Sequence, residues 1–149
     1  MSRGWAHRIL RARRSFFWLA LATLGAADQR QESIELPPGT LLLLVAPWCA
    51  PCWGELAHVD ALAKAAAPLK LRVLTMEDSA RARAMTAGLP PERQWTPRAA
   101  DRASVRAALW SVTPGLPFSV ATDAKGRICA QHGGGLTEAR ALLLVKQCG

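Results

Sequence analysis

The chain has 149 residues, half of them hydrophobic and a fifth charged, which suffices for one domain with a packed core. Its formal net charge is +8, but the first 27 residues hold five arginines and no acid, which leaves 14 basic and 11 acidic side chains (net +3) in the remainder. This ordinary balance, without a stripe of lysines and arginines, argues against binding to nucleic acids.

The first 27 residues resemble an export signal. Arginines up to Arg14 form a positive region, residues 16–24 are apolar, and small residues up to Ala27 suit cleavage. We expect cleavage near Ala27 and a bacterial protein that is periplasmic or otherwise exported, with its folded domain at residues 28–149. The alternative is an uncleaved, short N-terminal anchor, and in both cases the domain faces an oxidising compartment in which disulfides persist.

The first half of the domain alternates between strand and helix patterns. Residues 40–46 are apolar throughout and are bounded by prolines, which predicts a strand buried on both faces. A helical pattern over residues 52–67 ends at Pro68. A second buried strand is predicted over residues 69–76, followed by a helix over 77–88.

The second half adds a helix, a hairpin and a final helix. Residues 89–97 hold three prolines and are predicted to be irregular, with a short strand near Trp95. The remaining prediction is a helix over 99–112, strands over 118–121 and 127–132 joined by a turn at 123–126, and a helix over 136–147. This order predicts an α/β fold, with parallel units first and an antiparallel edge added by the hairpin.

Two cysteines stand at the turn between the first strand and the first helix. Cys49 and Cys52 are separated by two residues, at a place where backbone N–H groups and the helix dipole favour a thiolate. The thiolate is the form of cysteine that attacks disulfides, so the pattern predicts a dithiol that exchanges electrons with other disulfides. Two alternatives are a purely structural Cys49–Cys52 bridge and a metal site that also uses Cys129 and Cys148. We expect no metal site, because the last two cysteines lack the close spacing of a second ligand pair.

Several segments in order carry a resemblance to a known family. They are the strand running into residues 46–52, Glu55 three positions after the second cysteine, Gly115-Leu116-Pro117 before a strand, and the turn at 123–128. In these segments, which span about residues 37–147, the chain resembles the thioredoxin superfamily and, within it, the TlpA-like group of exported thiol:disulfide oxidoreductases. The resemblance implies a thioredoxin-like fold, a central mixed sheet flanked by helices.

The resemblance also implies roles for residues around the cysteine pair. Cys49 would be the exposed, attacking cysteine, and Cys52 would resolve the mixed disulfide. Trp48, Pro51 and Leu116 would bind the substrate, with the backbone of Leu116 pairing to a substrate strand. We expect Trp53, which follows the motif, to cover the core; the alternative is that it enlarges an apolar docking face.

Two further site residues follow from the resemblance, each with a plainer alternative. Pro117 would be a cis-proline opposite the cysteines; alternatively, it is an ordinary turn proline. Glu55 would be a partly buried acid with a raised pKa that carries protons to Cys52. The alternative is a solvated glutamate that stabilises the first turn of the helix.

The remaining cysteines favour a structural disulfide. Cys129 lies near the start of the last predicted strand, and the final helix runs back far enough to bring Cys148 toward it. Such a bridge would stabilise the fold by about 3 kcal/mol. The alternative is a second redox relay.

Together these features predict an exported protein-disulfide reductase that needs no cofactor. We expect its partners to be disulfide-bearing exported proteins, with cytochrome c maturation as the context that the resemblance suggests, and a membrane or periplasmic electron donor. We expect a monomer. The alternatives are a disulfide-forming oxidase or isomerase, and a non-enzymatic thiol module for metal binding or assembly.

Overall fold

The computed structural model describes residues 34–148 of the chain. The predicted export signal at residues 1–27 lies outside the described residues. None of the helices found in residues 34–148 has the length and apolar character that a membrane span requires.

A four-stranded mixed sheet forms the centre of the domain, with the strand order β2-β1-β3-β4. Strand β1 (Thr40–Val45) pairs in parallel with β2 (Lys70–Thr75) and antiparallel with β3 (Phe118–Thr122). The hairpin partner of β3 is β4 (Ile128–Gly133), which forms the antiparallel edge. This sheet and its flanking helices confirm the predicted α/β fold class.

Strand β1 is buried at all six positions because it lies in the middle of the sheet and both of its faces are covered. Leu41, Leu43 and Val45 belong to one core cluster. Leu42 and Leu44 belong to the second cluster, on the opposite face. A continuous apolar run is the sequence pattern that this two-sided burial requires.

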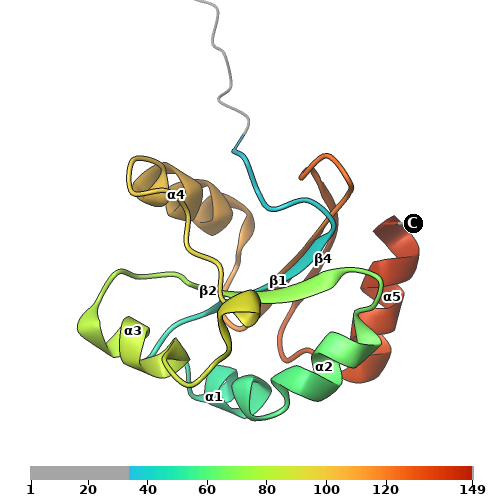
Figure 1. The fold of residues 1–149 in the computed structure, drawn as a ribbon, viewed down its shortest axis with the longest axis horizontal. Helices are drawn as coiled ribbons and strands as arrows, with labels where there is room; N and C mark the ends of the chain where they lie inside the picture. The colour runs from blue at the N-terminus through green and yellow to red at the C-terminus, as the bar shows by residue number, and fades with distance from the viewer. Residues whose placement is uncertain (1–33, 149) are drawn as a thin grey trace, which may run out of the picture. The chain divides into compact units, whose positions relative to one another are not determined.

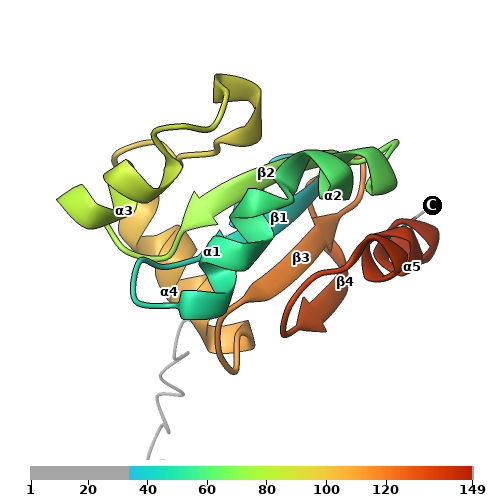
Figure 2. The same ribbon diagram turned by 90° about the horizontal axis from the view of Figure 1, so that it is seen from below.

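Helices cover both faces of the sheet (Figure 1). One face carries α1 (Ala50–Ala57), α2 (Val59–Ala65) and α5 (Glu138–Cys148), and α4 (Arg102–Val112) packs on the other. Figure 2 shows α1 and α2 in front of β1 and β2. The short α3 (Ala80–Thr86) and a 3-10 turn (Pro91–Arg93) follow β2.

The first helix differs from the sequence prediction of one helix over residues 52–67. It begins at Ala50, and His58 (φ −114°, ψ 15°) divides it into α1 and α2. No proline stands at the break, so composition alone does not signal it. The short strand predicted near Trp95 is present only as an isolated parallel bridge between Val73 and Gln94.

Four loops meet at the sheet edge that follows the carboxyl ends of β1 and β2. The parallel register places Val45 beside Thr75, and the antiparallel register places Phe118 beside Leu44. Gly133, at the end of β4, pairs with Phe118. Segments 46–49, 76–79, 113–117 and 134–137 therefore leave the sheet at one edge, and the cysteine pair lies among them.

Candidate active site

Cys49 and Cys52 form a disulfide at the start of α1, with their Cα atoms 5.4 Å apart. Cys49 occupies the N-cap position, and its carbonyl accepts a hydrogen bond from the N–H of Cys52 at 3.1 Å. The N–H of Cys49 in turn donates to the carbonyl of Ala46 at 3.0 Å. When the disulfide is reduced, the positive end of the α1 dipole is therefore placed to stabilise a thiolate on Cys49.

The structure corrects the expectation that Cys49 is exposed. With the disulfide closed, Cys49 is 4% exposed and Cys52 is fully buried. The tight turn from Ala46 brings Cys49 back against the core cluster that also contains Val45. Cys49 is still the more exposed cysteine of this pair, and is therefore the one that a partner reaches more easily.

Two tryptophans flank the cysteine pair and are open to solvent. Trp48 is 64% exposed, and Trp53 is 48% exposed with its indole N–H bonded to the carbonyl of Pro47 at 3.1 Å. The expectation that Trp53 covers the core is therefore wrong, because the hydrogen bond holds the ring over the preceding loop. Pro51, in the first turn of α1, is also exposed.

The loop before β3 brings Leu116 and Pro117 to the same edge as the cysteines. The peptide bond between them is cis. The carbonyl of Pro117 accepts a hydrogen bond from the N–H of Gly134 at 3.0 Å. Within residues 34–148, neither the N–H nor the carbonyl of Leu116 forms a hydrogen bond. The backbone of Leu116 is thus free to pair with an added strand.

Glu55 is a buried carboxyl group one turn after Cys52 on α1. Its Oε1 accepts a hydrogen bond from the N–H of Leu136, whereas its Oε2 has no partner within residues 34–148. Burial raises the pKa of Glu55 above the usual carboxyl range, and the hydrogen bond from Leu136 opposes part of that rise. Glu55 is therefore not a solvated first-turn glutamate.

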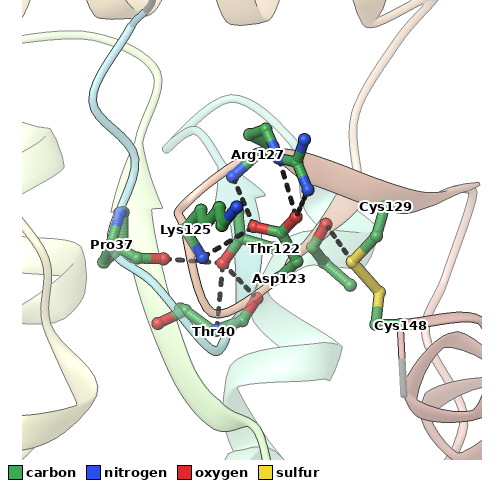
Figure 3. Close-up of a disulfide and its surroundings, with 9 residues drawn as sticks. Pro37, Thr40, Thr122, Asp123, Lys125, Arg127, Cys129 and Cys148 are labelled. Carbon is green, nitrogen blue, oxygen red and sulfur yellow. Dashed lines mark hydrogen bonds and ion pairs between the residues drawn. A yellow bond between two sulfur atoms is a disulfide. The ribbon is translucent and has the colours of Figure 1, made fainter.

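A second disulfide joins Cys129 of β4 to Cys148 at the end of α5, with Cα atoms 5.3 Å apart (Figure 3). The Sγ of Cys129 also lies 3.2 Å from the carbonyl oxygen of Ala121, on the neighbouring strand. Both cysteines pack against the core cluster that contains the first pair. The bridge thus fixes the last turn of α5 to the sheet.

Figure 3 also shows a polar network near this disulfide, where β3 turns into β4. The buried hydroxyl of Thr122 accepts from the N–H of Thr40 at 3.0 Å and donates to the carbonyl of Pro37 at 2.6 Å. Asp123 accepts from the N–H groups of Lys125 and Arg127 and pairs with the Arg127 guanidinium. These contacts close the hairpin turn and fasten the segment that leads into β1.

The four cysteines do not converge on one site. They form two separate disulfides, and residues 34–148 contain no group of three or more histidine, cysteine, aspartate or glutamate side chains arranged to hold a metal ion.

A group of ion pairs at this edge joins segments that are distant in the sequence. Three arginines surround Asp78, just after β2. The only sequence signal is that Arg102 and Arg106 lie one helical turn apart on α4. Nothing local relates them to Asp78.

Comparisons with known proteins identify the fold. No protein-family model and no curated protein matches the chain. Among solved structures, DsbF from Mycobacterium tuberculosis is similar with a TM-score of 0.55 and 20% identity, over 75% of this chain and 83% of that chain. The N-terminal domain of PilB from N. meningitidis is similar with a TM-score of 0.55 and 21% identity, over 76% and 84%. The chain has a thioredoxin-like fold.

Proposed function

We propose that this protein is a thiol:disulfide oxidoreductase that acts through Cys49 and Cys52. The observation that carries the proposal is the disulfide at the N-terminus of α1, beside the unpaired backbone of Leu116. A cysteine pair at a helix start is a reactive arrangement, because the helix favours the thiolate. The free backbone of Leu116 supplies a place where an extended client segment adds as a strand.

The reaction proceeds by two exchanges of sulfur. The Cys49 thiolate attacks one sulfur of a client disulfide, which forms a mixed disulfide and releases the first client thiolate. The Cys52 thiolate then attacks the Sγ of Cys49, which closes the Cys49–Cys52 disulfide and releases the second client thiolate. Two electrons pass to the client, and its two thiolates take up two protons. In this proposal Glu55 accepts the proton that the Cys52 thiol loses before its attack.

We further propose that the pair works as a reductant. The two residues between the cysteines are Ala50 and Pro51, so no histidine stands there to stabilise the reduced thiolate. A less stabilised thiolate makes the disulfide harder to reduce and lowers the reduction potential. A dithiol donor in the membrane or periplasm would restore the reduced pair.

The proposed setting is outside the cytoplasm, where a monomer reduces disulfides of exported proteins. The client class that the family resemblance favours is the cysteine pair of an apocytochrome c haem-attachment segment. No cofactor takes part in this chemistry.

The decisive experiment is to equilibrate the full chain in glutathione or dithiothreitol buffers and to count alkylated cysteines by mass. A potential at or below about −250 mV supports a reductant, whereas a value near about −120 mV makes the protein an oxidant. Cys52→Ser should trap a mixed disulfide with a client, and Cys49→Ser should trap none. The proposed roles would be contradicted if Cys52→Ser trapped no mixed disulfide, or if Cys49→Ser trapped one.

A further inference from the structure

An excess of positive charge lies at the sheet edge that carries the cysteine pair. The carboxylate oxygens of Asp78 form ion pairs with three arginines. The distances are 3.2 Å to Nη1 of Arg83, 3.4 Å to Nη1 of Arg102 and 3.8 Å to Nη1 of Arg106. We call these three arginines the arginine cluster. One carboxylate faces three guanidinium groups, so the formal charge of the group is +2.

The residues next to the arginine cluster do not cancel this excess. Glu77 and Arg81 lie next to it in the sequence, and their formal charges cancel each other. Asp101, which precedes Arg102, pairs with Arg98 at 2.7 Å. Two members are open to solvent, since the side chain of Arg83 is 70% exposed and that of Arg102 is 40% exposed. The surplus charge is therefore available to an anionic group on a partner.

Backbone contacts place the arginine cluster beside the cysteine loop. The N–H of Met76 donates to the carbonyl of Val45 at 2.8 Å, so the chain leaving β2 runs next to the chain leading to Cys49. Nε of Arg106 donates to the carbonyl of Thr75 at 3.0 Å, which ties α4 to the same strand end. The cluster and the disulfide thus share one edge of the sheet.

Exposed tryptophans lie beside the disulfide and on the helix that carries two members of the arginine cluster. Trp48 and Trp53 flank the disulfide, and Trp110, which is 38% exposed, follows Arg102 and Arg106 at four-residue steps on α4. Helix α4 then ends at Val112 and leads into the loop of Pro117. Tryptophan and arginine are the residues most enriched among the energetic centres of protein interfaces.

We propose, resting on the proposed function, that this surface selects client disulfides flanked by aspartate or glutamate. The occupant is an extended client segment whose cystine reaches Cys49 while its acidic side chains meet Arg83 and Arg102. Attraction between opposite charges at an edge beside the reacting atoms speeds the encounter of client and protein. The tryptophans supply apolar contact that does not depend on client charge.

The test uses the reduced full chain and three oxidised peptides with the same Cys-x-x-Cys ring. Their flanks, outside the ring, carry four glutamates, four serines or four lysines. The second-order rate constant of disulfide exchange is followed by tryptophan fluorescence at 20 mM and 500 mM salt. We expect the acidic peptide to react about five-fold faster than the neutral one at low salt, with the gap closing at high salt.

Two double variants, each of which removes two positive charges, test whether the preference for acidic peptides depends on the arginine cluster. Arg83→Gln/Arg102→Gln removes two charges from the arginine cluster and leaves Arg106 to hold Thr75. Lys70→Gln/Lys125→Gln removes two exposed charges at the opposite edge of the sheet. We expect the first variant to lose the acidic preference, so that it reduces the acidic and neutral peptides at equal rates, and the second to keep the preference.

Three results would overturn the proposal. If the neutral peptide is not reduced by the unmodified chain, the proposed function fails and the inference fails with it. If the neutral peptide is reduced but flanking charge has no effect, the function stands and the inference alone is refuted. Arginine-dependent binding to phosphatidylglycerol vesicles, without any peptide preference, would assign the surface to a membrane and also refute it.

Discussion

Glu55 of α1 is joined to Leu136, two residues before the start of α5, by a hydrogen bond from the Leu136 backbone N–H to the Glu55 carboxylate. The bond links the helix that carries the cysteine pair to the segment between β4 and the last helix. It satisfies one carboxylate oxygen and leaves the other without a protein partner in residues 34–148. A buried acid held in this way is costly to ionise, because only part of its lost hydration is replaced.

Replacing Glu55 by Gln should stabilise the protein above neutral pH. Glutamine keeps an oxygen for the Leu136 N–H and removes the buried charge. Since burial raises the pKa of Glu55, its protonated form favours the folded state, and that stability is lost as the pH rises through the raised pKa. We expect Glu55→Gln to gain on the order of 1 kcal/mol at pH 8 and nothing at pH 4, as measured by urea unfolding.

The control for Glu55→Gln is Glu92→Gln, at an exposed position of the 3-10 turn. The free energy of unfolding of Glu92→Gln should equal that of the unmodified chain at both pH 4 and pH 8. A Glu55→Gln variant that is less stable than the unmodified chain at pH 8 would mean that the charged carboxylate stabilises the fold.

Removing the second disulfide should weaken the fold without altering the first pair. Cys129 and Cys148 are separated by 19 positions, so Cys129→Ala/Cys148→Ala should cost about 3 kcal/mol in the free energy of unfolding. Denaturant titration measures this loss. The reduction potential of Cys49–Cys52 should stay constant, and a shift in that potential would instead support a redox relay between the two pairs.

Replacing Thr122 by Val should destabilise the protein by about 1–3 kcal/mol, because the change leaves buried polar partners without a hydrogen bond. The hydroxyl of Thr122 serves the N–H of Thr40 and the carbonyl of Pro37, and valine has nearly the same shape but no polar atom. Thr96→Val, at an exposed site, is the matched control. Equal thermal unfolding midpoints for the two variants would contradict this account.

Replacing Gly126 by Ala should also destabilise the fold. Gly126 adopts φ +76° in the turn between β3 and β4, and an added Cβ would collide with the carbonyl oxygen of Leu36. The left-handed conformation alone costs a side chain about 1–2 kcal/mol, and the collision adds to it. The comparison is Gly88→Ala, where the added methyl meets nothing within 4 Å and stability should barely change.

The sequence pattern correctly predicted those strands and turns that depend on residues close together in the chain. Residues 40–45 form a buried strand as their apolar run and bounding prolines indicate, and Gly126 takes the left-handed conformation suited to its turn. In α5 the apolar residues alone were a poor guide to burial. Ala141 and Leu144 face the core, whereas Leu142 and Leu143 are exposed.

Features that depend on packing between distant segments were beyond the sequence. The burial of Cys49 follows from how its loop folds onto the core. Asp78 and Arg102 are separated by 24 positions, and they meet only because α4 packs against the end of β2. The break at His58 likewise has no proline or glycine beside it to mark it.

The strand order has a consequence for the growing chain. Strand β1 lies between β2 and β3, and the contact between Thr40 and Thr122 spans 82 positions. During synthesis, Cys49 and Cys52 therefore emerge long before the strand that precedes them has both of its neighbours. A separation of three positions lets these cysteines meet without tertiary structure, whereas Cys148, the last of the four cysteines to be made, is 19 positions from Cys129. The segment that carries Cys49 and Cys52 is thus accessible to its surroundings in the nascent polypeptide, and completion of the sheet is the event that buries it.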